Sequence, residues 1–307
     1  MFEITSVAKP ATVDEALTYL TRGGATMAKT GAAQPGVRLL AGGTDLLVAS
    51  RDRNLRWETL IDLKNIPELH GIHLSGGTLR VGSTTTIHEL AASPLVAATL
   101  PPLAEAAGML GSYQLRQRAT LGGNICNASP ATETACPLLV GNARVQLAGP
   151  TGTRTVPLCE LLLAPGKTAL ESGEILVSVE CAVPERAHPD LRYGGAYIKL
   201  GPRRAMDIAI VNVAVLVGLD TDSVCRDARI ALGSVGPTAF RVPQAEDLLI
   251  GQALGSNAVA AAADAARAAA RPITDIRATA GYRLDMVRNL VETAIITALE
   301  RVTPAGL

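Results

Sequence analysis

Short apolar segments separated by polar, glycine-containing turns dominate the first part of the chain. The segments at 2–7, 37–41, 59–63 and 175–183 have the length and apolar character of buried strands. Between the first two, Thr12-Val13-Asp14-Glu15 forms a capping box. This motif predicts a helix that carries Ala16, Leu17 and Leu20 on its apolar face and ends at Gly23-Gly24.

Two hairpins are predicted in the same part of the chain. Residues 72–74 and 78–81 flank Ser75-Gly76-Gly77, and residues 145–147 and 153–156 flank Gly149-Pro150-Thr151-Gly152. The spacing of apolar residues predicts helices over 45–51, 102–111 and 132–140, and a second capping box lies at 86–89.

The polar, proline-bounded segment 184–190 predicts a linker, and the pattern changes after it. Strands are predicted at 193–200, 208–219 and 228–232, followed by helices at 243–250, 257–270 and 283–302. Strands followed by helices indicate an α+β domain with an antiparallel sheet. At 307 residues the chain is long enough for two domains with well-buried cores.

Composition excludes several classes of function. The 28 basic and 28 acidic residues give zero net charge, and aromatic residues make up 3%, which argues against a nucleic-acid-binding protein. The longest apolar run, 208–219, is interrupted by Asn212 and is too short for a membrane span. The N-terminus lacks the pattern of a secretory signal.

Cysteine and histidine usage predicts a cytoplasmic protein without its own metal centre. The five cysteines are scattered and never spaced as CxxC, which is typical of reduced thiols. The four histidines lack the spacing of zinc ligands. Because no secretory signal is recognised, the Asn127-Ala128-Ser129 glycosylation sequon has no expected role.

Two glycine pairs are the main candidates for a ligand site. The first lies in Leu39 to Leu47, the second in Thr120 to Pro137, and each follows apolar residues and precedes hydrogen-bonding side chains. Glycine lets the backbone approach an anion and direct amides toward it, so the pairs predict two halves of a pyrophosphate cradle. The alternative is that each is an ordinary turn between two elements.

Four side chains extend this hypothesis. Thr44 offers a hydroxyl, and the Asn124 amide can both donate and accept. Glu133 can accept from two ribose hydroxyls, unless it is a solvated carboxylate at a helix start. Lys199, inside an apolar strand, can stabilise the anionic form of a reduced flavin, unless it lies on the exposed face of a sheet.

Other chemistries lack their motifs. No GxGxxG fingerprint or GxSxG elbow is present, and the Walker A pattern that would end in Gly166-Lys167-Thr168 fails at Leu161. No nucleophile and base form a convincing set, so no catalytic residue is predicted. Any chemistry would therefore depend on a bound organic cofactor.

Five segments together resemble one family almost from end to end. They are AGGTDLL at 41–47, TLGGNICNASPATETACPLL at 120–139, PGKTAL at 165–170, EILVSV at 174–179 and AYIKLGPRRAMDIAIVNVAV at 196–215. In this order they resemble the FAD-binding medium subunit of molybdenum hydroxylases, such as bacterial xanthine dehydrogenase and carbon monoxide dehydrogenase.

This resemblance implies an α+β fold with a two-subdomain FAD-binding domain of the vanillyl-alcohol-oxidase (PCMH) type and a smaller C-terminal domain. The FAD-binding domain would cover 1–183, with subdomains at about 1–60 and 61–183. The C-terminal domain, resembling that of the carbon monoxide dehydrogenase flavoprotein, would cover 191–302.

The resemblance also implies positions around FAD. Leu110 would lie where some relatives have an aromatic residue, Leu176 and Lys199 would lie near the flavin ring, and Glu133 would replace an Asp that is common in the family. The pyrophosphate would be lined by Leu39, Leu40, Ala41, Gly42, Gly43, Thr44, Asp45 and Leu46 on one side and by Thr120, Gly123 and Asn124 on the other.

The implied function is electron transfer within a heteromeric enzyme. A large partner subunit would carry a molybdopterin-type cofactor, and a small one would carry 2Fe–2S clusters that reduce FAD in this chain. The assembly would be a dimer of heterotrimers, and the acceptor NAD, oxygen or a quinone. The AGGTD and NICNASP segments resemble the xanthine dehydrogenase branch more than the carbon monoxide branch, which suggests a purine or another N-heterocycle as substrate.

A benzoyl-coenzyme-A-reductase-type relative is disfavoured, because no cysteine-rich insertion follows the second glycine pair. Two other functions remain open. One is a stand-alone FAD oxidoreductase of the same fold, and the other is a non-catalytic assembly subunit that has lost FAD.

Overall fold

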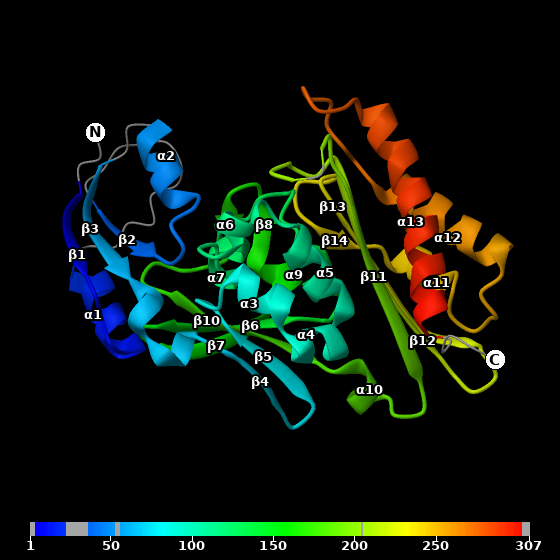
Figure 1. Cartoon of the computed structure of the whole chain (residues 1–307), viewed down its shortest axis with the longest axis horizontal. Coiled ribbons are helices and arrows are strands. Elements are labelled where there is room, and N and C mark those ends of the chain that lie inside the picture. Colours follow the sequence, from blue (N-terminus) through cyan, green and yellow to red (C-terminus); the bar gives the residue numbers. More distant parts are fainter. Residues whose placement is uncertain (1–3, 23–35, 53–55, 204, 303–307) are drawn as a thin grey trace.

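A small parallel sheet begins the chain in the computed structural model, which describes residues 4–22, 36–52, 56–203 and 205–302 (Figure 1). Its strands are β1 (Ile4–Ala8), β2 (Val37–Leu40) and β3 (Trp57–Asp62), in the order β1-β3-β2. Both pairings are parallel, and helices α1 (Val13–Arg22) and α2 (Leu46–Asp52) follow β1 and β2. Strand β2 of this sheet therefore leads directly into the first glycine loop.

A five-stranded antiparallel sheet follows, in the order β4-β5-β10-β6-β7. Its strands are β4 (Ile72–Ser75), β5 (Thr78–Gly82), β6 (Arg144–Gly149), β7 (Gly152–Pro157) and β10 (Ile175–Ala182). The two predicted hairpins lie at the edges, and β10 joins them in the centre. Ile175 and Val177 of β10 share a small core with Ile61 and Ala16, so the first sheet packs on the second.

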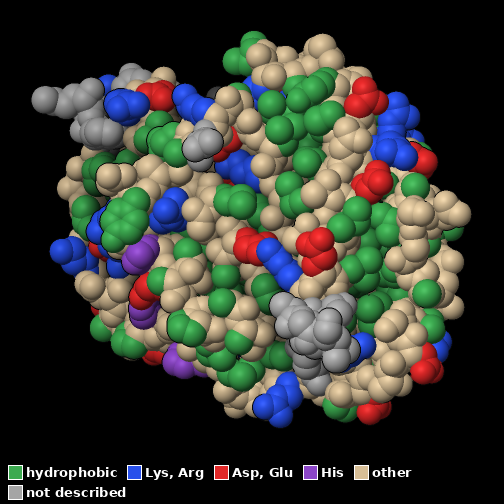
Figure 2. Space-filling view, turned by 45° about the vertical axis from the view of Figure 1, so that its right-hand side comes forward, with side chains coloured by type: hydrophobic (Ala, Val, Ile, Leu, Met, Phe, Trp, Pro, Cys, Tyr) green, Lys and Arg blue, Asp and Glu red, His purple; other side chains and the backbone are tan. Residues whose placement is uncertain are grey.

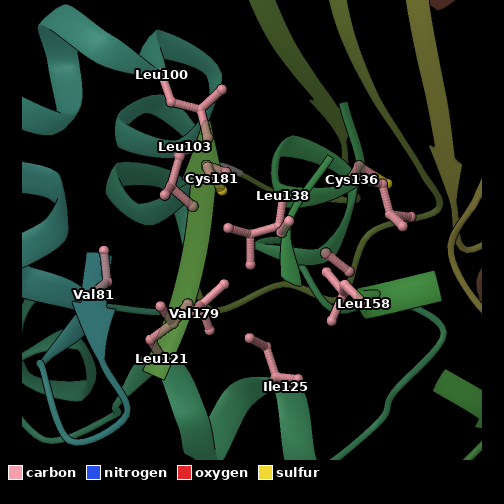
Figure 3. Packing of buried hydrophobic residues seen from close by; sticks show 14 of the residues in the cluster. Val81, Leu100, Leu103, Leu121, Ile125, Cys136, Leu138, Leu158, Val179 and Cys181 are labelled. Atoms are coloured by element: carbon pink, nitrogen blue, oxygen red, sulfur yellow. The ribbon is translucent and has the colours of Figure 1, made fainter. Parts of the chain in front are cut away.

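Short helices cover the five-stranded sheet and enclose the largest core (Figures 1 and 3). In Figure 3, Leu121, Ile125 and Leu138 point into the same core as Val179 of β10. Each such buried aliphatic side chain contributes about 1.5–3 kcal/mol to folding. The elements here are η1 (Leu63–Asn65), η2 (Pro67–Leu69), α3 (Ile87–Ala92), α4 (Pro94–Thr99), α5 (Pro101–Met109), α6 (Tyr113–Arg116), α7 (Leu121–Cys126), α8 (Ala135–Val140), α9 (Leu158–Leu161), β8 (Leu162–Ala164) and β9 (Lys167–Thr168).

The C-terminal part is an antiparallel sheet between two layers of helices. Its order is β11-β12-β13-β14, and its central strand β12 is buried along its whole length. Figure 1 shows α12 and α13 on one face, while α5 and α8 contact the other. Burial on both faces explains why β12, apart from Asn212, is apolar without alternation. The elements are α10 (Pro184–Ala187), β11 (Arg192–Leu200), β12 (Val211–Leu219), β13 (Cys225–Gly233), β14 (Phe240–Arg241), α11 (Pro243–Asp247), α12 (Ser256–Ala269) and α13 (Ala280–Val302).

Three sequence expectations are corrected by these elements. The predicted linker contains a helical turn, α10, because Pro184 suits the first position of a helix. Residues 208–210 precede β12 in a loop that returns from β11. The second glycine pair is helical, in α7, rather than a loop. Gly23 and Gly24 lie outside the described residues.

Charged side chains are interspersed over the face shown in Figure 2. Lysine and arginine alternate with aspartate and glutamate there, and no single sign dominates.

A buried arginine fixes the start of α13. Arg283, 3% exposed, donates to the carbonyl oxygens of Ile210 and Ser234 and to Asp275 Oδ1 at 2.8 Å. Asp275 also accepts from the backbone amides of Arg277 and Ala278. The carboxylate therefore connects the loop before α13 to the sheet.

We expect Asp275→Asn to destabilise the protein by about 1 kcal/mol at neutral pH. The Arg277 amide, followed by the Arg283 and Arg277 side chains, lowers the pKa of Asp275 to about 2. Since the folded pKa lies below the usual value, this stabilisation is present above about pH 4 and is lost as the pH falls toward 2. Urea unfolding across this range should show the two proteins converging at low pH. Asp285→Asn, at a mostly exposed carboxylate, should give no such dependence.

Candidate functional site

The first glycine loop depends on one positive φ angle and one close backbone approach. β2 runs into residues 41–45, and Gly43 has φ 77°, a conformation that favours glycine. A Cβ on Gly42 would lie 2.0 Å from the Arg118 carbonyl oxygen, so only glycine allows this loop to touch the segment before α7. The sequence therefore needs both glycines, each for a different reason.

The amides of this loop are available to a ligand. Within the described part of the chain, the backbone N–H groups of Gly42, Gly43 and Thr44 have no acceptor. Successive unpaired amides in a turn form a concavity that suits an anion. Lys64 adds a cation beside the loop, since its Nζ donates to the Ala41 carbonyl oxygen at 3.2 Å and to Asp62 Oδ1 at 2.6 Å.

The second glycine segment offers a surface rather than free amides. Thr120 caps α7 by accepting from the Gly123 amide at 3.2 Å, and the Gly122 amide donates to the Ser83 carbonyl oxygen at 2.8 Å. A Cβ on Gly122 would lie 2.6 Å from that of Ser83, so this glycine is required by packing. Gly123, in contrast, is exposed.

The two segments face each other. A Cβ built on Gly123 would lie 3.0 Å from Thr120 Oγ1 and 4.0 Å from the Ala41 Cβ, so it would enter the space between them. Asn127 Nδ2 donates to Asp45 Oδ1 at 3.3 Å across the same gap. Unpaired amides on one side and a side-chain-free position on the other fit an extended anionic group such as a pyrophosphate.

Asn124 connects this cradle to the helix that follows. Its Oδ1 accepts from the Thr134 hydroxyl at 2.6 Å, and Thr134 is fully buried. With its oxygen engaged, the half-buried amide keeps its NH₂ group as a donor. Thr134 directly follows Glu133, so the cradle is continuous with a second polar cluster.

That cluster is a buried ion triad between the two halves of the chain. Lys199 Nζ lies 3.0 Å from Glu133 Oε1 and 2.8 Å from Asp207 Oδ1, and the three side chains are 4%, 11% and 5% exposed in the order Lys199, Glu133, Asp207. Burial raises the pKa of Glu133, and the Lys199 charge opposes that rise. Glu133 is therefore not a solvated carboxylate, and Lys199 is not on an exposed sheet face.

Leu110 and Leu176 both belong to the largest core. Leu110 follows α5, and its carbonyl oxygen accepts from the Arg116 side chain at 3.0 Å. Leu176 lies on β10, where the pairing with β6 shifts register. Both are nearly fully buried, so they contribute apolar packing to this core rather than polar contacts.

Sequence reasoning missed two charged residues of this region. Lys64 follows the end of β3 by two positions, and Asp207 lies in the hairpin loop between β11 and β12. Asp207 lies inside the segment 196–215 and Lys64 directly follows the predicted strand at 59–63, but nothing in the pattern pairs either residue with a partner. Among the described residues no three metal-ligating side chains come together, and no described helix is long and apolar enough to span a membrane.

Family profiles match both parts of the chain. Residues 2–185 match the FAD binding domain in molybdopterin dehydrogenase, and residues 196–298 match the CO dehydrogenase flavoprotein C-terminal domain. The match therefore extends over most of the chain and includes every candidate residue.

Curated relatives agree with this match. The chain is 32% identical over 300 residues to a xanthine dehydrogenase FAD-binding subunit of Escherichia coli O157:H7, covering 97% of each. It is 39% identical over 264 residues to the carbon monoxide dehydrogenase medium chain of Hydrogenophaga pseudoflava, covering 86% of this chain and 90% of the relative. The identity to the carbon monoxide dehydrogenase chain is higher but extends over a shorter stretch. Sequence identity therefore does not assign this chain to the xanthine dehydrogenase branch or to the carbon monoxide branch.

Solved structures share the fold over nearly the whole chain. Carbon monoxide dehydrogenase from Hydrogenophaga pseudoflava, in a form lacking the Mo-pyranopterin moiety, superposes with a TM-score of 0.86 at 36% identity. Quinoline 2-oxidoreductase from Pseudomonas putida 86 gives 0.85 at 28% identity. Each comparison covers 98% of both chains, which confirms the α+β fold predicted from the sequence.

Proposed function

We propose, since this chain belongs to the family of FAD-binding medium subunits of molybdopterin dehydrogenases, that it binds FAD between its two glycine segments and passes electrons from a partner subunit to an external acceptor. The observation that carries the proposal is the cradle itself. Unpaired amides at Gly42, Gly43 and Thr44 belong to the loop whose Ala41 approaches the open position at Gly123.

The residues of this chain would bind and orient the cofactor. The loop Leu39 to Leu46 and the segment of Thr120, Gly123 and Asn124 would hold the pyrophosphate, with the amides of the first loop as donors. Bound FAD supplies redox chemistry, accepting electrons singly and releasing them in pairs.

Beyond the pyrophosphate, the apolar and the charged side chains would have different roles. Leu110 and Leu176 would exclude water from the flavin ring, since both are nearly fully buried. Glu133 would accept from the ribose through the oxygen that does not meet Lys199, and Lys199 would set the local charge. No residue of this chain is assigned an acid–base role.

The remaining assignments concern the assembly. We propose a large subunit with a molybdopterin-type cofactor and a small subunit with 2Fe–2S clusters, arranged as a dimer of heterotrimers. The FAD-binding domain would cover residues 1–183, with subdomains at about 1–60 and 61–183, and the C-terminal domain 191–302. A purine or another N-heterocycle is the proposed substrate of the whole enzyme. Among the relatives, some are named for enzymes that act on xanthine, nicotine or nicotinate, and others are named for carbon monoxide and glyceraldehyde dehydrogenases.

The two alternative functions would require different features at the cradle. A stand-alone FAD oxidoreductase would need acid–base groups beside the cradle. The buried charged groups that adjoin the cradle through Asn124 and Thr134 are Glu133, Lys199 and Asp207, and these are paired with one another. An assembly subunit without FAD would not need to keep Gly123 open beside a loop with unpaired amides.

Reconstitution of the purified chain tests the proposal. We expect FAD to bind with a dissociation constant of about 1 μM or lower, equivalent to about −8 kcal/mol, and to give flavin bands in the visible spectrum. FMN, which lacks the pyrophosphate, should bind far more weakly. Equal affinity for FAD and FMN would contradict the cradle, and absence of any flavin binding would contradict the function.

Two further measurements separate the remaining alternatives. Purification of the tagged chain from its native cell should recover two unlike partners, whereas a stand-alone oxidoreductase would be recovered alone. Stopped-flow reoxidation of the reduced complex by NAD, oxygen and a quinone identifies the acceptor.

A further inference from the structure

Lys199 has more acceptors than protons to donate. Its ammonium carries three N–H groups. Four oxygens surround it: Asp207 Oδ1 at 2.8 Å, Glu133 Oε1 at 3.0 Å, and the carbonyl oxygens of Asp207 at 3.2 Å and Met109 at 3.4 Å. One positive charge therefore lies against two carboxylates, and no N–H is left for another ligand without a partner being displaced.

Asp207 is held in this position by the hairpin loop between β11 and β12. A Cβ on Gly201 would lie only 1.4 Å from Asp207 Oδ2, so the missing side chain at Gly201 is the space that the carboxylate occupies. The neighbouring Met206 has φ 53°, and its amide donates to the Gly111 carbonyl oxygen across the domain boundary.

The loop turns one side chain inward between two that face outward. Met206 and Ile208 are both about half exposed, while Asp207 between them is buried. A buried carboxylate is costly unless it is paired, so the placement of Asp207 against Lys199 is specified by the loop rather than incidental.

We propose that Asp207 is a positioning residue. Held in the space left by Gly201, its carboxylate fixes the Lys199 ammonium against Glu133 and compensates the positive charge that Lys199 would otherwise present to the flavin. This inference rests on the proposed function, in which Lys199 lies beside FAD. It assigns to Asp207 and Gly201 a role in setting the flavin's reduction potential.

Charge counting gives the direction of the effect. Lys199 alone would present one positive charge and favour the anionic reduced flavin, which raises the potential. With Asp207 ionised the pair is neutral, and an ionised Glu133 makes the triad negative. Asp207 therefore lowers the potential, which makes the reduced flavin a better donor to the next acceptor.

Asp207→Asn tests this in the full chain loaded with FAD. The amide keeps the size and one acceptor but removes the charge. We expect the reduced flavin to bind about tenfold more tightly relative to the oxidised form, which raises the two-electron midpoint potential by about 30 mV. Dye-equilibration titration measures the potential, and fluorescence titration measures the affinity for oxidised FAD.

Gly201→Ala provides an independent variant, because it keeps the charge but displaces the carboxylate. We expect a shift in the same direction. The control is Asp264→Asn, which removes a mostly exposed carboxylate paired with Arg288 on the far side of the C-terminal sheet and should leave the potential unchanged.

A fall in stability or FAD affinity with an unchanged potential in both variants would show a purely structural role and overturn the inference. A shift to lower potential would also overturn it. Failure of the wild-type chain to bind FAD would contradict the proposed function instead, so the two failures are distinguishable.

Discussion

Gly123→Leu is expected to lower the affinity for FAD at least a hundredfold, roughly 2.7 kcal/mol, while leaving the protein folded. The backbone of Gly123 is compatible with a side chain, because its φ lies outside the left-handed region. The new atoms would enter the space toward Ala41, where the pyrophosphate is proposed to lie. Flavin content after reconstitution and the thermal unfolding midpoint measure the two effects separately.

Two other glycines give matched controls for this substitution. Gly108→Leu on α5 adds the same side chain at a position with nothing within 4 Å of the new Cβ, so both affinity and stability should stay near wild type. Gly122→Ala, in contrast, should destabilise the fold, because its Cβ would lie 2.6 Å from the Ser83 Cβ. Normal FAD content in Gly123→Leu would contradict the placement of the cofactor.

Lys199→Met is expected to destabilise the protein by about 3–5 kcal/mol at neutral pH, because it leaves two buried carboxylates without a partner. Burial already raises the pKa of Glu133 in the wild type, and loss of the Lys199 charge that opposes this rise would raise it further. Groups with a raised folded pKa stabilise the protein below the unfolded value and lose that contribution as the pH rises. The difference in the free energy of unfolding between Lys199→Met and the wild type should therefore become smaller as the pH falls from 8 to 5.

Chemical denaturation at several pH values measures this effect. Lys167→Met removes an exposed lysine and should change stability by less than about 0.5 kcal/mol at every pH. Adding Glu133→Gln and Asp207→Asn to Lys199→Met should restore much of the loss, since no unpaired charge remains. A pH-independent deficit in Lys199→Met would indicate lost packing rather than an unbalanced charge.

The sequence predicted those elements whose pattern is set locally. The capping box at Thr86 and Glu89 forms as expected, and both hairpins form around their glycine turns. The apolar run that became β12 was recognised as a strand, although its first three residues lie in the preceding loop. Periodicity and turn chemistry act over a few residues, so they are visible in a single sequence.

Features that depend on distant partners could not be predicted in this way. Gly122 lies in a helix and packs against Ser83, a contact between distant segments that no local pattern encodes. Glu133 and Lys199 were open to ordinary explanations, and Asp207 was not singled out, until the fold brought the three together. The resemblance implied that Glu133 and Lys199 belong to the site, but their pairing with Asp207 is visible only in the fold.

The position of β10 also dictates an order of assembly. This strand lies in the middle of its sheet but follows both edge hairpins in the chain. During synthesis the hairpins β4-β5 and β6-β7 therefore have no strand between them until Ile175–Ala182 has left the ribosome. The sheet under α7 closes only then, so the nascent chain must carry two exposed hairpin edges until its central strand arrives.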